Sequence, residues 1–256
     1  MTLLNTEDAW LPTVLAAPII GSFLGVLIRR LPVGERVVLA RSRCDSCQHA
    51  LAPRELVPLW SYLAQRGRCR RCGAAIAPFH FAIELAAIAV ALWVALLGAD
   101  TPVRLWADCL LGWTLLGLAW IDWQHMRLPD VLTLPLLLAG LFATALIEPG
   151  ELTSHALGAA LGWAGLRALA ATYRGLRGFS GIGAGDAKLL AAGGAWLGWE
   201  ALPTVLLLAA LSGLSFAIVL RLRGRTIGWT SRIAFGPWLA LAIWLTRLYG
   251  ADWLAA

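Results

Sequence analysis

Eight apolar runs, most of them close to the length that crosses a bilayer, alternate with polar connections along the chain. They cover residues 10–28, 80–98, 104–121, 129–147, 154–172, 187–199, 203–220 and 233–249. A spanning helix needs about 20 apolar residues, so the 187–199 run is short for a complete crossing. No stretch alternates apolar and polar residues in the manner of a strand. The pattern predicts an all-α, polytopic membrane bundle of about eight segments.

The composition agrees with a membrane protein and excludes several other classes. Hydrophobic residues make up 59% of the 256 residues and charged residues 14%, with a mean hydropathy of +0.73. A soluble domain usually has about 25% charged residues, and a disordered chain has far less apolar sequence. The net charge is +6, but the basic residues stand between apolar runs, so we expect them to set topology and not to bind nucleic acid.

The distribution of positive charge predicts the orientation. Arg29 and Arg30 follow the first run, which places that end in the cytoplasm and the N-terminus outside. Alternation of the spans then leaves four polar stretches inside, which are 29–79, 122–128, 173–186 and 221–232. In or beside these stretches lie 18 of the 21 Lys and Arg residues. We therefore expect a multi-pass protein with its basic loops in the cytoplasm.

The stretch 29–79 is the largest extramembrane piece and contains four cysteines. Cys44 and Cys47 form one CxxC pair, and Cys69 and Cys72 form a second. Two such pairs are typical of a structural zinc site with four thiolate ligands. A loop of about 50 residues has too small a core to fold unaided. We therefore predict a zinc-binding cytoplasmic insertion held together by a structural Zn²⁺.

Other interpretations of these side chains stay open at this point. Four ordinary thiols or a redox CxxC would also fit, although a redox site does not require two pairs. The expected cytoplasmic location argues against disulfides. His49 is a fifth candidate ligand, although a solvated histidine is the simpler interpretation, and Cys109 in the third run is expected to serve packing.

Three aspartates lie where the apolar runs meet the expected cytoplasmic face. Asp122 closes the third run, Asp130 opens the fourth, and Asp186 follows a glycine-rich loop before the sixth. An ionisable group at the membrane boundary is a functional candidate by default. Two carboxylates from different helices can share one proton, so that one activates a water and the other protonates a scissile carbonyl. Such a pair can hydrolyse peptide bonds without a metal.

Each acid also has a structural interpretation. Asp130 follows a proline that starts a helix, where acidic residues are common, and Asp186 could be a helix cap with Lys188 beside it. Asp122 is harder to explain in this way, because the dipole at a helix C-terminus repels negative charge. We therefore take Asp122 and Asp186 as the candidate pair. Glu84 lies inside the second run, where it would pair with an arginine, line a polar cavity or contact a ligand.

Several motifs together resemble the type IV prepilin peptidases, the membrane aspartic proteases of type IV pili and type II secretion. The resemblance covers almost the whole chain. It rests on Gly21-Ser22-Phe23-Leu24 with Arg30-Leu31-Pro32, the segment from Cys44 to Cys72, Ile121-Asp122 with Leu128-Pro129-Asp130, Gly183-Ala184-Gly185-Asp186-Ala187-Lys188-Leu189, and Phe235-Gly236-Pro237.

The resemblance implies an activity and a set of residues. Asp122 and Asp186 match the catalytic pair, and the substrates would be prepilins or pseudopilins, cleaved after a glycine that follows a basic leader. Many members also methylate the new N-terminal residue with S-adenosylmethionine, for which Gly67 and Glu84 are the candidates here. The implied location is the bacterial inner membrane, among membrane lipid. The implied organisation is a first transmembrane helix in 1–28, the zinc-binding loop in 29–79 and a membrane protease core in 80–256.

The chain departs from the family pattern in places. Gly25 stands where the family often has Asn, Gln124 where an acid is common, Phe79-His80-Phe81 where a Tyr-Pro pair is usual, and Ala234 where Pro is usual. None of these changes affects the candidate catalytic pair, but those before Glu84 bear on methyl transfer. The alternative function is a non-catalytic membrane scaffold or transporter that uses the acids for ion coupling.

Overall fold

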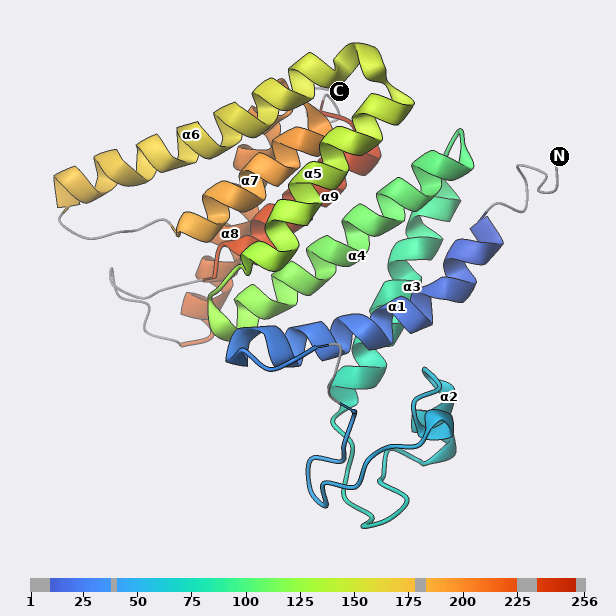
Figure 1. The fold of residues 1–256 in the computed structure, drawn as a ribbon. Helices are drawn as coiled ribbons and strands as arrows, with labels where there is room; N and C mark the ends of the chain where they lie inside the picture. Colours follow the sequence, from blue (N-terminus) through green and yellow to red (C-terminus); the bar gives the residue numbers. More distant parts are fainter. Residues whose placement is uncertain (1–9, 38–40, 178–182, 225–233, 252–256) are drawn as a thin grey trace, which may run out of the picture. The chain divides into compact units, whose positions relative to one another are not determined.

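The structure is a computed structural model that describes residues 10–37, 41–177, 183–224 and 234–251. The long elements are all helices (Figure 1). They are α1 (Trp10–Arg30), α3 (Pro78–Leu97), α4 (Pro102–His125), α5 (Asp130–Ile147), α6 (Leu152–Arg177), α7 (Ala184–Leu197), α8 (Leu202–Leu222) and α9 (Gly236–Tyr249). The described ranges also contain a short α2 (Trp60–Ala64) and the 3₁₀ turns Leu31–Val33, Pro53–Glu55 and Pro149–Glu151.

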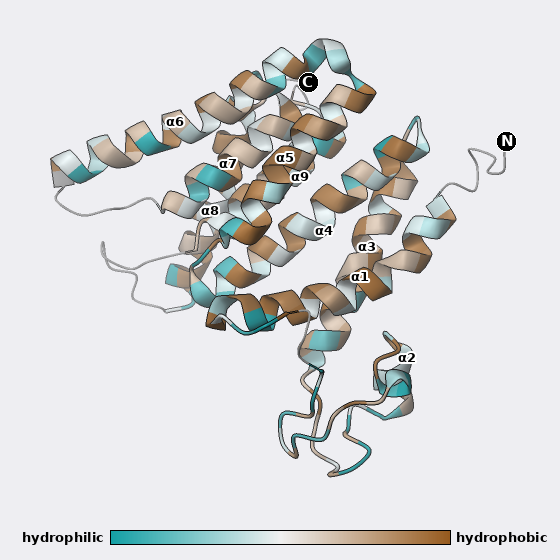
Figure 2. Ribbon diagram, in the orientation of Figure 1, coloured by the Kyte–Doolittle hydropathy of each residue, from teal (hydrophilic) through white to brown (hydrophobic). Residues whose placement is uncertain are grey.

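The all-helical architecture predicted from the apolar runs is confirmed. Each run coincides with one long helix to within a few residues, and the described residues contain two isolated β-bridges but no strand. Within the described residues, five helices are long and apolar enough to cross a membrane, namely α1, α3, α4, α5 and α8. Apolar residues run along these helices (Figure 2). The protein is therefore a multi-pass membrane protein.

The chain forms two compact units, Met1–Trp113 and Thr114–Ala256, with α4 running from one into the other. In the first unit α1 packs along α3. A Cβ on Gly21 would lie 2.7 Å from the Cα of Glu84, so the glycine is what lets the two backbones approach. The cysteine-containing insertion connects these two helices.

In the second unit the short helix α7 is the core element. Its residues from Asp186 to Trp196 are buried almost without interruption among α5, α6 and α9. A Cβ on Gly194 would lie within van der Waals overlap of the Gly158 carbonyl on α6, so α6 and α7 touch through their backbones. The 14 residues of α7 span about 21 Å, less than the ~30 Å hydrocarbon core. Because protein surrounds α7, its length does not have to match the bilayer.

Candidate active site and metal centre

Asp122 lies in the last turn of α4 and its side chain is buried, with 5% of its surface exposed. The backbone N–H of Gly236, at the start of α9, donates to Asp122 Oδ2 at 2.9 Å. A Cβ on Gly236 would lie 2.6 Å from the same oxygen. The glycine of the Phe235-Gly236-Pro237 motif is therefore the donor that fixes this carboxylate. No local sequence pattern indicates this contact, because 114 residues separate the two groups.

Asp186 lies in the first turn of α7 and is also buried. Its Oδ2 accepts the backbone N–H of Gly183 at 3.1 Å, so the side chain caps the helix that carries it. The N-cap residue is Gly183, so Asp186 caps the helix from its third residue and is not the N-cap residue that the sequence suggested. Capping does not exclude a second role for this carboxylate. A Cβ on Gly185 would lie 2.9 Å from the Cβ of Leu128, which places α7 directly against the α4–α5 connection. Gly181 and Ile182 of the same motif lie outside the described residues.

The two carboxylates influence each other electrostatically. The carboxylate of Asp186 is buried and lies within electrostatic range of the carboxylate of Asp122. Two buried acids with this coupling can hold one proton between them, which is the protonation state that acid–base hydrolysis requires. Both aspartates lie at helix ends in the second unit, Thr114–Ala256.

Asp130 begins α5 and also forms an ion pair with Lys188. Its Oδ1 lies 2.5 Å from Lys188 Nζ, and both side chains are partly exposed. Together with the contact between Leu128 and Gly185, this ion pair ties the α4–α5 connection to the first turns of α7. The sequence analysis placed Lys188 beside Asp186 and missed its partner, which is 58 residues away.

We expect the ion pair to position Asp186. Asp130→Asn or Lys188→Met should lower kcat about tenfold while KM changes little, because the pair orients α7 and not the substrate. The exchange Asp130→Lys with Lys188→Asp should recover much of the loss. The check is the rate of peptide cleavage in each variant. Single variants with full kcat would contradict a positioning role.

We expect Gly236→Ala to disable Asp122, because the added methyl group would collide with the carboxylate. Cleavage should fall about 100-fold, the size of effect expected when a catalytic group is displaced by about 1 Å. The matched control is Gly165→Ala on α6, where no atom lies within 4 Å of the added Cβ. A Gly236→Ala protein that is as active as the control would remove Gly236 from the site.

Four cysteine thiols converge in the insertion. The Sγ atoms of Cys44, Cys47, Cys69 and Cys72 all lie within 4.8 Å of one another. Each CxxC forms the same turn: the N–H of Cys44 donates to the carbonyl of His49, and that of Cys69 donates to the carbonyl of Ala74. The turns are closed by matching isolated bridges, Arg43 with Ala50 and Arg68 with Ala75. The two pairs are therefore structurally equivalent knuckles facing a common centre.

Each knuckle closes with a turn of the same backbone geometry. The residue after each second cysteine has a positive φ, 56° at Gln48 and 72° at Gly73, and its N–H donates to the carbonyl of the first cysteine of the pair. The backbone N–H groups of Cys72 and Arg71 lower the pKa of the Cys69 thiol to about 7. The backbone N–H of Ala74 also lowers the pKa of Cys72, but burial and hydrogen bonds to the other thiols outweigh it and raise that pKa to about 11. A four-thiolate set of this geometry suits tetrahedral Zn²⁺. His49 contacts Arg71, with Nδ1 2.9 Å from Nη1, and is not part of the cluster.

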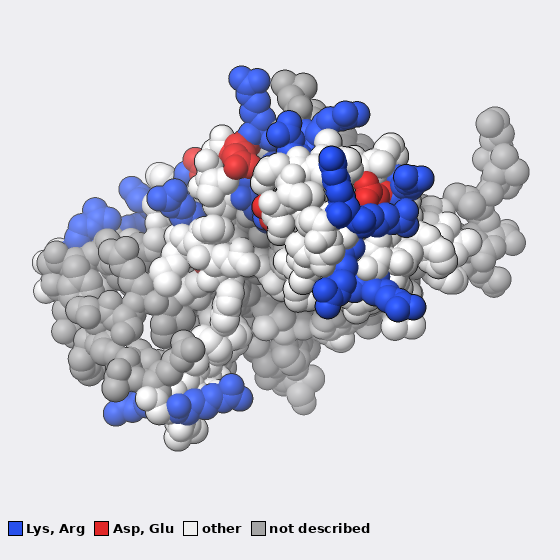
Figure 3. Space-filling model, turned by 90° about the horizontal axis from the view of Figure 1, so that it is seen from below, with Lys and Arg blue, Asp and Glu red and all other residues white. Residues whose placement is uncertain are grey.

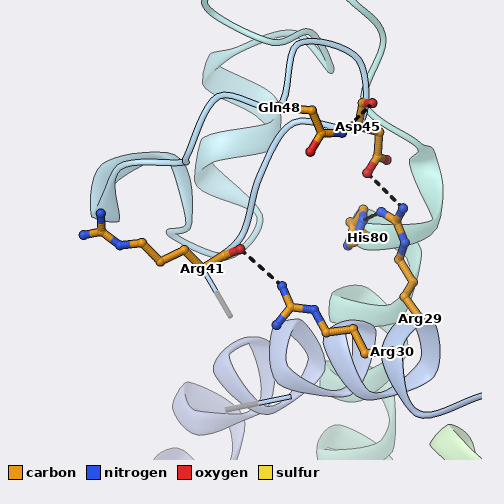
Figure 4. Close-up of polar contacts among 6 residues, drawn as sticks. All are labelled: Arg29, Arg30, Arg41, Asp45, Gln48 and His80. Atoms are coloured by element: carbon orange, nitrogen blue, oxygen red, sulfur yellow. Dashed lines mark hydrogen bonds and ion pairs between the residues drawn. The ribbon is translucent and has the colours of Figure 1, made fainter. Parts of the chain in front are cut away.

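Arginines anchor the first knuckle to the membrane helices (Figure 4). Arg29 at the end of α1 lies 2.9 Å from Asp45 Oδ1 and 3.0 Å from His80 Nε2. Arg30 donates to the backbone carbonyls of Arg36, Val37 and Arg41. Positive charge at this helix end, which the sequence analysis assigned to topology, thus also holds the insertion.

Gly67 lies against one ring of an aromatic pair, and Glu84 lies one turn along α3 from the other ring. Glu84 is 7% exposed, and its Oε2 accepts the backbone N–H of Leu59 at 2.7 Å. Tyr62 stacks on Phe81, one turn before Glu84, with ring centroids 5.1 Å apart. Gly67 has a φ of +66°, and a Cβ there would lie 3.0 Å from the Tyr62 hydroxyl. Their assignment to a cofactor stays a prediction.

Comparisons with known proteins support the sequence resemblance. Residues 15–97 match the bacterial peptidase A24 N-terminal domain, and residues 109–218 match the type IV leader peptidase family. Proteins named prepilin leader peptidase/N-methyltransferase are similar over most of their length. The one from Aeromonas salmonicida strain A449 is 40% identical, covering 90% of this chain and 87% of the relative. The one from Pseudomonas aeruginosa is 38% identical, covering 93% of this chain and 89% of the relative. No solved structure matches the chain.

Proposed function

The chain belongs to the type IV leader peptidase family, and we propose on this basis that it is a membrane aspartic endopeptidase acting on type IV prepilins or type II secretion pseudopilins. The substrate leader would be basic and would be removed after a glycine. The observation that carries the proposal is the pair of buried carboxylates, Asp122 and Asp186, each held by a backbone N–H. The scaffold or transporter alternative is not favoured, because these relatives carry peptidase names.

The proposed mechanism uses one water and the pair of acids. One ionised carboxylate takes a proton from the water, whose oxygen attacks the carbonyl carbon of the scissile bond. The other, protonated, carboxyl gives its proton to the carbonyl oxygen, and the resulting tetrahedral species then collapses with protonation of the leaving amine. In both aspartates Oδ2 takes the backbone N–H, so we expect Oδ1 to face water and substrate.

We propose that the site faces the cytoplasm, in the inner membrane. Along the chain α4 ends at the candidate site, whereas α5, α7 and α9 begin there, as alternating membrane crossings require. The positive residues that follow α1 and α8 would keep those ends inside. The basic leader would then be cut at the cytoplasmic face while the apolar helix of the substrate stays among the membrane segments.

We propose that the insertion holds one Zn²⁺ and that the first unit also transfers a methyl group from S-adenosylmethionine to the new N-terminus. The support is the four-cysteine cluster and the N-methyltransferase name of the relatives. Gly67 and Glu84 are the candidate cofactor residues. The cofactor would supply the methyl group, and the carboxylate of Glu84 would attract its positive charge.

The direct test is the intact mass of a cognate prepilin after incubation with the protein in membranes. We expect loss of the leader and gain of one methyl group. Leader loss without the methyl group would show that the protein has the peptidase activity alone. An uncut cognate prepilin, with the protein folded and zinc-loaded, would contradict the proposal.

We expect Glu84→Gln to lower methylation at least tenfold while leader cleavage persists, since the substitution removes the charge but keeps an oxygen for the Leu59 N–H. The matched control is Glu55→Gln, because Glu55 also accepts a backbone N–H in the insertion, from Ala52 at 2.8 Å. The check is the same mass analysis. Equal methylation by the two variants would exclude a role for the Glu84 charge.

A further inference from the structure

The insertion exposes a cluster of large apolar side chains. Leu56 is 43% exposed, Val57 45%, Trp60 69% and Leu63 59%, and we call these four residues the interfacial patch. They lie in and just before the short helix α2. Apolar side chains gathered in this way on an extramembrane loop indicate a contact surface.

Contacts with α3 place the patch beside the membrane helix and not beyond its end. The N–H of Leu59 reaches Glu84, which is six residues inside α3, and Tyr62 stacks on Phe81, three residues inside. At 1.5 Å per residue these contacts lie about 5 to 9 Å along the helix from its first residue. Because α3 is a candidate membrane span, the patch lies beside the end of a span, close to the level at which interfacial helices bury their apolar faces.

The charge around the patch suits an anionic partner. Arg54 and Arg66 flank it in sequence, and both are exposed. The stretch 29–79 holds ten Lys and Arg against three Asp and Glu. Basic side chains likewise predominate over acidic ones among the described residues of the lower face (Figure 3).

We propose that the interfacial patch inserts into the headgroup region of the membrane that α3 crosses, with Arg54 and Arg66 contacting anionic lipid phosphates. A tryptophan and leucines with flanking arginines are the residues that anchor proteins at this level of a bilayer. A basic prepilin leader is a poor occupant, because the same arginines would repel it. The anchor would hold α2, and through Leu59 and Tyr62 the start of α3, at a fixed depth.

The test measures the depth of position 60 in the full-length protein. A fluorescent coumarin amino acid replaces Trp60, and in a second protein it replaces Arg41, an exposed residue ahead of the first knuckle. Both proteins are placed in nanodiscs of phosphatidylcholine with phosphatidylglycerol. Quenching is measured with lipids that carry a nitroxide near the headgroup and with aqueous iodide.

We expect position 60 to be quenched about threefold more by nitroxide lipid than position 41, and less by iodide. Adding Leu63→Asp, or omitting phosphatidylglycerol, should reduce the lipid quenching at position 60 without loss of zinc. Equal iodide quenching at both positions would overturn the proposal, as would lipid quenching indifferent to phosphatidylglycerol. Displacement of the lipid quenching by a prepilin peptide would assign the patch to substrate instead. None of these readouts depends on peptidase activity.

Discussion

Asp122→Asn and Asp186→Asn are each expected to abolish leader cleavage, with a loss of about 10³-fold or more, the upper part of the range for removing a general acid or base. An asparagine side chain keeps an oxygen for the N–H of Gly236 or Gly183, so the fold should persist. What it loses is the ability to take or give the proton. The measurement is the fraction of prepilin cut, together with the helical circular dichroism of each purified variant.

The matched control is Asp100→Asn, because this aspartate is exposed and lies in the first unit beside Arg104. That variant should cut as well as the native protein. Cleavage retained in Asp122→Asn or Asp186→Asn would remove that residue from the mechanism. Loss of cleavage in all three would point to a general effect of carboxylate removal.

Removal of the metal is expected to have the second largest effect. Cys44→Ser or Cys72→Ser should reduce bound zinc from about one per chain to near zero, because each knuckle supplies half of the ligand set. Structural zinc contributes on the order of 10 kcal/mol to the folding of small domains. The insertion should then become sensitive to protease between α1 and α3. Metal analysis and limited proteolysis in detergent are the measurements.

Cys109→Ala is the matched control for the thiol substitutions. Cys109 is completely buried on α4 and lies outside the four-cysteine cluster. Its loss should leave zinc unchanged, and any destabilisation should be that of a small packing defect. Native protein purified without chelator and found to contain almost no zinc would refute the metal assignment.

The helices could be predicted from sequence because the bilayer imposes one simple requirement. Every backbone group in a span must bond within its own helix, so apolar length alone identifies the segments. Local spacing likewise predicted the cysteine cluster, since a CxxC places its two thiols within one turn. The positions of Asp122 and Asp186 at helix ends were evident because the apolar runs mark where each helix ends or begins.

The contacts between distant segments could not be predicted in this way. The N–H of Gly236 on Asp122, the ion pair between Asp130 and Lys188, and the N–H of Leu59 on Glu84 join residues separated by 114, 58 and 25 positions. No periodicity or spacing rule connects such pairs. They depend on which helices pack together, which is decided by small residues at the points of closest approach.

The short helix α7 shows most clearly which features depend on the local sequence and which depend on tertiary packing. Its sequence determined that it is helical and that Asp186 lies near its start, because the apolar run and the glycines before it are local signals. Its burial on all sides was decided by tertiary packing, where Gly158 and Gly194 bring two backbones into contact. The sequence thus determined the helices, the four-cysteine cluster and the candidate acids. Only the packing decided how a carboxylate from α4 and one from α7 come to influence each other.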